Sequence, residues 1–227
     1  MRLFLLQTYS QARTCALLCA ALGTLTLTLT ACNIVAPVAL IVAGLPKTKA
    51  LYGLDRSKTY IILVDDLRSR LPKRSLRRVI SETAEGELIR NGVLQDTRLI
   101  SSAAAYRVIQ DERWGQQISV IDIGSRVGAD VVIYVTIDVW QLTRDGVSSW
   151  PSVTVRVKVF DVAENRRLWP ENETGFLFTV EPMDLRIEDI PGSLAERSNL
   201  EQKLAKRLGT AIAQVFYKHE SSKSARK

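Results

Sequence analysis

A thiol near the amino terminus is the side chain in this sequence best placed for a covalent modification. Cys32 directly follows the small residue Ala31, at the end of a stretch from Cys15 to Thr30 that contains no charged residue. Arg2 and Arg13 precede that stretch. A positive start, an apolar middle and a small residue before the cut are typical of a secretory signal peptide. We therefore predict cleavage between Ala31 and Cys32.

The four residues Leu29-Thr30-Ala31-Cys32 resemble the lipobox of bacterial lipoproteins. The resemblance implies that Cys32 carries acyl chains, palmitate among them, on its sulfur and its amine. Two or more acyl chains hold a protein on a membrane stably, whereas one chain binds only marginally. It also implies a bacterial cell-envelope location with the domain in the periplasm. Asn33 stands where some lipoproteins carry the aspartate that retains them in the inner membrane, which favours the outer membrane.

An uncleaved membrane anchor is the alternative interpretation of the same segment. Uncharged residues continue from Cys15 to Gly44, which exceeds the roughly 20 residues needed to span a bilayer. Pro37 would kink such a helix. The stretch from Thr24 to Thr30 is poor in strong helix formers, which favours the cleaved signal peptide. Under the alternative, the protein would be a single-pass adaptor subunit of an envelope transport or synthesis complex.

Few residue types in the chain could hold a metal or act in a catalytic triad. The 227 residues include 3 cysteines and 1 histidine, His219. Cys15 and Cys19 lie within the predicted signal peptide, so the mature chain would keep Cys32 alone. These counts exclude an internal disulfide, a cysteine metal site and a histidine-based triad. Walker, Rossmann and serine-nucleophile patterns are also missing from the sequence. We expect no metal, no cofactor and no enzymatic activity.

Positive charge is concentrated in one segment, from Arg68 to Arg78. The formal net charge is +7, but most other basic residues are spread among acids, which argues against a nucleic-acid partner. Six cations at the positive end of a predicted helix are locally unfavourable, so an anionic lipid, polymer or protein surface is a plausible partner. A solvated helix start is the alternative. The six residues are Arg68, Arg70, Lys73, Arg74, Arg77 and Arg78.

Two apolar segments have the length and composition of buried strands. The run Thr59–Val64 is rich in branched residues and ends at Asp65-Asp66. The run Val131–Trp140 is apolar on both faces at first and alternates later, as expected for a strand that leaves a buried centre. Between them, Pro72 begins a helical apolar stripe that Asn91-Gly92 ends.

The remaining patterns predict three more helices and a series of short strands. We expect helices over 103–113, with Ser102 as its cap, and over 120–127, between Ser119 and Gly128. Strands are expected at 98–100, 153–159, 166–169 and 176–180, followed by a helix whose stripe runs from Leu200 to Phe216. The predicted fold is therefore α/β: a mixed sheet of about four or five strands with a C-terminal antiparallel meander, packed by helices.

Two motifs carry a family resemblance. Gly128-Ala129-Asp130 leads from a helix into the strand Val131–Tyr134, and a later strand ends in the turn Asp161-Val162. These motifs, and the element order over 59–217, resemble the periplasmic domain shared by the curli secretion lipoproteins, the lipoprotein activators of penicillin-binding proteins and the amino-terminal domain of TolB. The resemblance implies a non-catalytic protein that docks on or assembles with other envelope proteins, copies of itself included. The connections are too short for the hairpins of a curli secretion channel.

Carboxylates and tryptophans supply the weaker candidates. Asp65 and Asp66 could bind a cation or act as a pair, but neighbouring strand residues point to opposite faces and converge poorly. A small hydrolase that uses these two residues with Asp130 and Asp138 is a less favoured alternative. Three tryptophans near predicted strand ends could anchor an interface or pack in the core: Trp140, Trp150 and Trp169.

The expected organisation has four parts. Residues 1–31 are the signal peptide, and residues 32–58 are a lipidated apolar segment with a short linker. Residues 59–218 form the periplasmic α/β domain, and residues 219–227 are a basic disordered tail. The short linker would hold the domain close to its membrane. Together these features predict a membrane-anchored envelope lipoprotein that acts as a binding or assembly factor.

Overall fold

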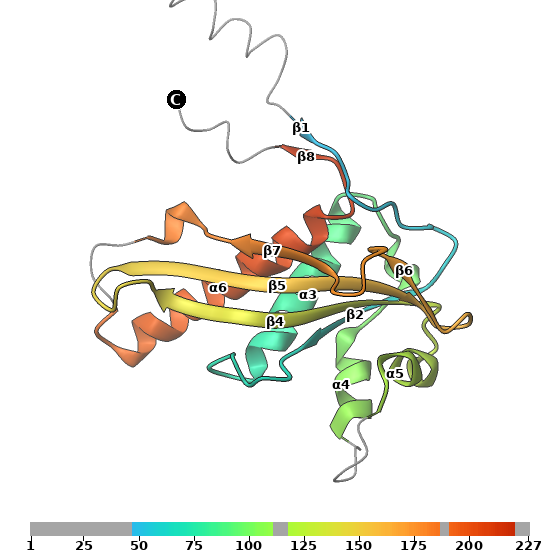
Figure 1. Ribbon diagram of the computed structural model, residues 1–227, viewed down its shortest axis with the longest axis horizontal. Coiled ribbons are helices and arrows are strands. Elements are labelled where there is room, and N and C mark those ends of the chain that lie inside the picture. Colours follow the sequence, from blue (N-terminus) through green and yellow to red (C-terminus); the bar gives the residue numbers. More distant parts are fainter. Residues whose placement is uncertain (1–46, 111–117, 187–190, 221–227) are drawn as a thin grey trace, which may run out of the picture. The chain divides into compact units, whose positions relative to one another are not determined.

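The computed structural model describes residues 47–110, 118–186 and 191–220 (Figure 1). The predicted signal peptide, Cys32 and the residues that follow the cysteine up to 46 lie outside this part, as does the tail after 220. One compact unit comprises Lys49–His219. Two short strands, β1 (Lys47–Thr48) and β8 (His219–Glu220), pair with each other. None of the helices in the described ranges is both long and apolar enough to cross a membrane.

A mixed sheet of six strands forms the centre of the compact unit. Its order is β3-β2-β4-β5-β6, and β7 also pairs with β5. The pairs β2–β3 and β2–β4 are parallel, whereas β5 is antiparallel to β4, β6 and β7. This confirms the predicted mixed sheet with an antiparallel meander. The bounds are β2 Tyr60–Asp65, β3 Leu99–Ile100, β4 Val131–Thr143, β5 Ser149–Asp161, β6 Arg166–Trp169 and β7 Phe176–Val180.

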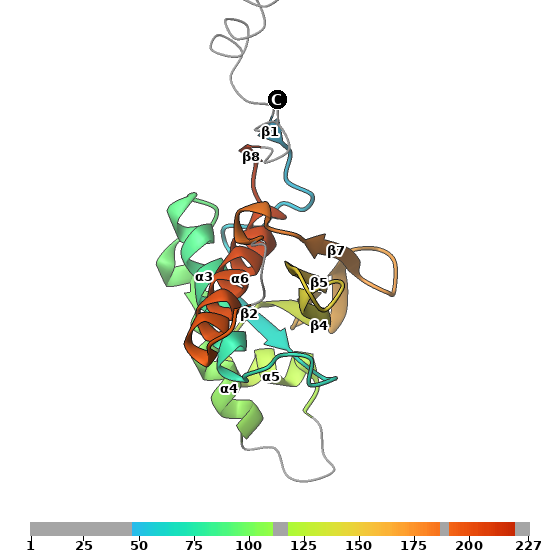
Figure 2. The ribbon, with the colours of Figure 1, turned by 90° about the vertical axis from the view of Figure 1, so that its left-hand side faces the viewer.

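Helices cover both faces of the sheet around β2. One face packs against α3 (Ser75–Arg90) and α6 (Leu194–Gln214), which lie side by side in Figure 2. The opposite face packs against α4 (Ser102–Gln110) and α5 (Val120–Val127). Strand β2 is therefore buried on both sides, which explains its uninterrupted apolar sequence. Two short 3₁₀ turns, η2 (Asp96–Arg98) and η3 (Met183–Leu185), complete the elements of the unit.

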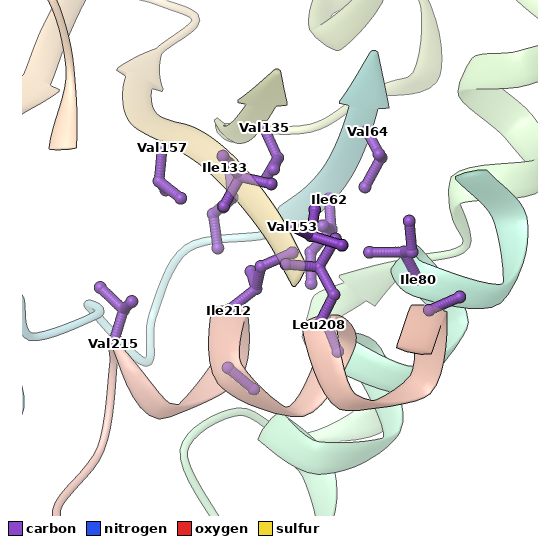
Figure 3. Close-up of a cluster of buried hydrophobic side chains, with 14 of the residues drawn as sticks. Ile62, Val64, Ile80, Ile133, Val135, Val153, Val157, Leu208, Ile212 and Val215 are labelled. Carbon is purple, nitrogen blue, oxygen red and sulfur yellow. The ribbon is translucent and has the colours of Figure 1, made fainter. Parts of the chain in front are cut away.

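The larger core lies between the sheet and the pair α3 and α6. Figure 3 shows Ile62 from β2, Ile133 from β4 and Val153 from β5 pointing toward Leu208 and Ile212 of α6. All five side chains are fully buried. Each such residue contributes roughly 1.5–3 kcal/mol through removal of its surface from water. The 3.6-residue stripe on α6 and the two-residue alternation on the strands are thus explained by one shared core.

A glycine sets the distance between α3 and α6. A methyl group on Gly209 would lie 2.6 Å from the backbone oxygen of Ile80 and 2.6 Å from Cβ of Thr83. Neither atom is the end of a flexible side chain, so the helices would have to separate to accommodate it. On α3, by contrast, a methyl group on Gly86 would meet only the Arg90 side chain, at 3.1 Å.

We predict opposite effects on stability for alanine at these two helical glycines. Gly209→Ala should lower the free energy of unfolding by about 1–3 kcal/mol, because it overpacks the interface between α3 and α6. Gly86→Ala should raise it by about 0.5–1 kcal/mol, because alanine favours the helix and the neighbouring arginine can move. Urea denaturation of both variants measures the difference. Equal effects of the two substitutions would contradict this account of the helix packing.

Two aspartates at one end of the sheet align β2 with its neighbours. The Asp130 carboxylate, just before β4, accepts hydrogen bonds from the Thr59 backbone N–H (2.7 Å) and hydroxyl (2.8 Å), just before β2. The Asp161 carboxylate, at the end of β5, accepts from Lys58 Nζ at 2.6 Å and from the Glu164 N–H at 2.9 Å. Both aspartates belong to the motifs that carry the family resemblance, and here their role is to hold strand ends together.

We predict that the bond between Lys58 and Asp161 makes the free energy of unfolding depend on pH. Hydrogen bonding to Lys58 lowers the pKa of Asp161, which is 2 % exposed. A lowered carboxyl pKa contributes stability above its unfolded value of about 3.9, and this contribution is lost as the pH falls through the folded pKa. Lys58→Met should therefore cost about 1–3 kcal/mol at pH 7 and progressively less below pH 4.

Thermal melts of Lys58→Met and the parent protein from pH 7 to pH 3 test this expectation. Lys203→Met is the matched control, because Lys203 is exposed and forms no ion pair with any described residue. A Lys58→Met deficit that stays constant across this pH range would exclude the Asp161 carboxylate as its cause.

Two helix starts differ from the sequence prediction. Helix α3 begins at Ser75, three residues after Pro72, and the preceding segment is a loop in which the Asp66 carboxylate accepts from the N–H groups of Arg70 (2.7 Å) and Leu71 (2.8 Å). Ser102 was predicted to cap α4 and is instead its first residue. Its N–H donates to Glu85 on α3 at 2.9 Å, so a carboxylate from another helix takes the capping role.

Candidate partner-binding cleft

A cleft opens at the carboxyl end of β2, bordered by the start of α3 and by α4 and α5. Its volume is about 1260 Å³. The start of α3 lies beside the cleft because β2 ends at Asp65 and the following loop leads directly into this helix. One wall carries arginines of α3, the other carries apolar residues of α4 and α5, and Leu63 and Tyr134 from the sheet line it as well. Three of the six predicted basic residues line the cleft: Arg74, Arg77 and Arg78.

The three arginines differ in how far their charge is already engaged. Arg78 is bonded to Glu82 on the same helix at 2.6 Å. Arg77 has Asp65 as its nearest carboxylate, with 3.9 Å between Nη1 and Oδ1, and its guanidinium carbon lies 5.6 Å from the centroid of the Tyr106 ring. Arg74 is exposed and forms no ion pair with any residue in the described part of the chain. The arginine wall therefore has unused hydrogen-bond donors.

The other three basic residues of the predicted cluster lie outside the cleft lining. Arg68 and Arg70 are exposed on the loop between β2 and α3. Lys73 turns toward α6, where Nζ donates to Ser198 Oγ at 2.8 Å and lies 3.3 Å from the buried Glu201 carboxylate. The prediction treated all six as one contact surface, whereas the structure divides them into a cleft wall, an exposed loop and an internal ion pair.

Asp65 and Asp66 have separate structural partners and do not form a catalytic pair. The Tyr134 hydroxyl donates to Asp65 Oδ2 at 2.9 Å. Asp66 accepts the two loop N–H groups described above. Burial, together with the nearby Asp65 charge, raises the pKa of Tyr134. The tyrosine hydroxyl is therefore a neutral hydrogen-bonding group in the cleft across the physiological pH range.

Two tyrosines and an apolar wall were missed at the level of sequence. Burial raises the pKa of Tyr106 to about 12, and its hydroxyl donates to the Val64 carbonyl at 3.1 Å. Tyr134 lies across the cleft, on β4. Tyr134 could have been recognised from the sequence, because its hydroxyl is the polar side-chain group in the run Val131–Val135, which is otherwise apolar on both faces. The apolar wall consists of Ile109 from α4 and of Ile118, Val120 and Ile123 at and within α5.

The remaining carboxylates considered for a hydrolase do not converge on the cleft. Asp130 is bonded to Thr59 at the other end of β2, and Asp138 is bonded to Arg156 on β5 at 2.7 Å. Neither lines the cleft. Within the residues that the structure describes, no three His, Cys, Asp or Glu side chains gather as a set of metal ligands.

The three tryptophans contribute to packing. The Trp169 ring contacts Tyr52 (5.8 Å between ring centroids) and Phe176 (5.1 Å), both at a tilt, and Trp140 packs against the main core. The guanidinium carbon of Arg186 lies 3.1 Å from the centroid of the Trp150 ring and covers it. Packing was one of the two interpretations of these residues, and the structure favours it.

Comparisons with known proteins identify structures of similar fold. No protein family and no curated protein matches the sequence. The PelC dodecamer from Paraburkholderia phytofirmans is 13% identical, with a TM-score of 0.41, and the match covers 76% of this chain and 98% of that chain. The LpoB C-terminal domain from Salmonella enterica is 17% identical, with a TM-score of 0.37 and coverage of 57% and 87%. TolB from Acinetobacter baumannii is 16% identical, with a TM-score of 0.30 and coverage of 74% and 29%.

TolB is also one of the proteins that the sequence resemblance named. At these identities the likeness concerns the order and arrangement of the elements, and it carries nothing about partners.

Proposed function

We propose that this chain is a cell-envelope lipoprotein that binds other envelope proteins through the cleft beside β2 and catalyses no reaction. It is anchored by acyl chains on Cys32, with its domain in the periplasm and the outer membrane as its location. The observation that carries the proposal is the cleft itself, where the arginines of α3 face an apolar wall of α4 and α5. Assembly with copies of itself is a separate expectation for this protein. Light scattering of the anchored protein would measure it.

The charges around the cleft support an acidic partner. Its lining contains three arginines and two aspartates, and Arg68 and Arg70 extend the positive surface on the adjoining loop. Asp66 accepts one backbone N–H on each carboxylate oxygen, and Asp65 accepts the Tyr134 hydroxyl on Oδ2. Exposed charges around a binding site accelerate encounter with an oppositely charged partner and align it. Apolar residues beside them provide the surface that an interface must bury.

The bonding of the carboxylates supports binding over catalysis. A general acid or base must reach the reacting group with a proton or lone pair that is free for transfer. Asp65, Asp66 and Asp130 all accept hydrogen bonds from groups that hold the fold together, and the last of these lies away from the cleft. The tyrosines that line the cleft have pKa values raised by burial, so they do not supply a base near neutral pH.

We predict that Cys32→Ser abolishes lipid attachment and release of the signal peptide. The parent chain should incorporate radiolabelled palmitate and have a mass lowered by the loss of residues 1–31 and raised by acylation. Metabolic labelling, intact-mass measurement and separation of the two membranes provide the readout. Cys19→Ser is the matched control, because Cys19 lies within the predicted signal peptide. Unchanged mass and membrane retention in Cys32→Ser would favour the uncleaved anchor and the single-pass adaptor.

We predict that reversing the arginine wall abolishes capture of the partner. The triple variant Arg74→Glu, Arg77→Glu and Arg78→Glu should lose most cross-linked products formed in native membranes, because its cleft would repel an acidic surface. Glutamates at the start of α3 interact favourably with the helix dipole, so the helix should persist. The control reverses three exposed basic residues elsewhere: Lys203, Lys206 and Lys218. Equal cross-linking by the parent and the triple variant would exclude the cleft as the binding site.

A further inference from the structure

Arg77 is placed differently from the other cationic residues around the cleft. Its side chain is 21% exposed, against 64% for Arg78. A distance of 3.9 Å to Asp65 is too long for a hydrogen bond, so the guanidinium position is maintained by charge attraction and by the Tyr106 ring below it. None of the described residues accepts a hydrogen bond from this guanidinium. A recessed arginine with five unused donors is suited to bidentate binding of an anionic group.

The groups around Arg77 limit the ligand that can reach it. Asp65 occupies one side, but its Oδ2 atom is engaged by Tyr134, so Asp65 attracts the guanidinium without saturating it. Arg74 lies one helical turn before Arg77 on the same side of α3 and is exposed at the rim. An incoming anion therefore meets Arg74 first and Arg77 deeper in the cleft.

The apolar wall opposite Arg77 indicates that the ligand carries an apolar group next to its anionic group. Ile109, Val120 and Ile123 line the cleft and belong to, or pack on, the smaller core between the sheet and helices α4 and α5. Leu67, at the mouth, is 63% exposed. A small inorganic anion would leave this apolar surface in water. A ligand that carries a large apolar side chain beside its anionic group would cover it.

The depth of the site distinguishes a peptide from a membrane surface. A bilayer is broad, and it can touch Arg68, Arg70 and Arg74, which are exposed on the loop and at the helix start. It cannot enter a concave site to reach a side chain that is four-fifths buried. An extended peptide is narrow enough to enter, and its successive side chains point to opposite faces, so that neighbouring side chains can contact opposite walls.

We infer that the cleft binds an extended acidic peptide segment of an envelope protein. One carboxylate of the segment binds the Arg77 guanidinium, and an adjacent large apolar side chain packs against the wall formed by Ile109, Val120 and Ile123. Arg68, Arg70 and Arg74 attract the segment without determining its sequence. This inference rests on the proposed function in using the same cleft, and it specifies the recognised chemistry and the residue that selects for it.

The test uses the full chain in phosphatidylcholine nanodiscs and a fluorescein-labelled decapeptide in which glutamate and leucine alternate. Arg77→Gln should weaken binding by about tenfold or more, because it removes a charge-assisted bidentate contact. Arg68→Gln, the same change at an exposed position outside the cleft lining, should weaken it by less than about threefold. Arg77→Lys keeps the charge but loses the planar fork, so its affinity should be intermediate.

Two further peptides test each half of the recognised unit. Replacing every glutamate by glutamine, or every leucine by serine, should each reduce affinity for the parent chain. Equal effects of Arg77→Gln and Arg68→Gln would overturn the inference, as would a serine peptide that binds as well as the leucine peptide. Flotation with phosphatidylglycerol vesicles is the lipid arm. Vesicle binding that depends on Arg77, without peptide binding, would assign the cleft to lipid and also overturn the inference.

The outcomes separate this inference from the proposed function. If the charge-reversed triple variant loses its cross-linked partners while the parent chain ignores the peptides, the cleft binds proteins through another chemistry and only the inference fails. If the peptides bind through Arg77 but cross-linking in membranes persists in the triple variant, the recognition chemistry holds and the assigned role of the cleft in partner capture fails.

Discussion

The alignment of β2 with β4 is the constraint on which the rest of the structure depends. These strands are parallel and far apart in sequence, so no tight turn determines their register. The Asp130 carboxylate provides that determinant, because it accepts from both the backbone and the hydroxyl of Thr59. Tyr60 and Val131 consequently begin their strands at the same level. A slip by one residue would exchange the side chains that β2 presents to the two helix pairs and leave neither core properly filled.

The position of the cleft follows from that alignment. Because β2 and β4 start at one level and β4 is the longer strand, the carboxyl edge of β2 at Asp65 lies beside the first half of β4. Asp65 and Tyr134 meet there across β2 and β4, and the loop after β2 returns α3 with Arg77 over the same edge. Ligands in open α/β sheets bind in the crevice outside the carboxyl ends of the strands. Asp130, which aligns β2 and β4 at one end of β2, thus also determines that Asp65 and Tyr134 meet at the other end.

The periodicity of apolar residues was sufficient to predict the helices and strands that form the core, but it could not predict the residues at which helices begin. The stripes of α3 and α6 and the runs of β2 and β4 were recognised because burial imposes a pattern of 3.6 or 2 residues. The predicted start of α3 lies three residues before the observed one, and the sequence did not reveal the loop before it, in which Asp66 binds the N–H groups of Arg70 and Leu71. The cap of α4 was assigned to Ser102 because the role of Glu85 depends on a contact between two helices.

The candidate site shows the same division between local and long-range information. A cluster of six basic residues is visible in the sequence, yet its use depends on residues far along the chain. Glu201 is buried on α6, and an unpaired buried carboxylate is costly, so Lys73 is drawn toward it and away from the cleft. Tyr106 comes from α4 and provides the ring beneath Arg77. Charge density therefore predicts that an anion is attracted, whereas only the packing of α3 against α4 and α6 decides which arginine remains to bind it.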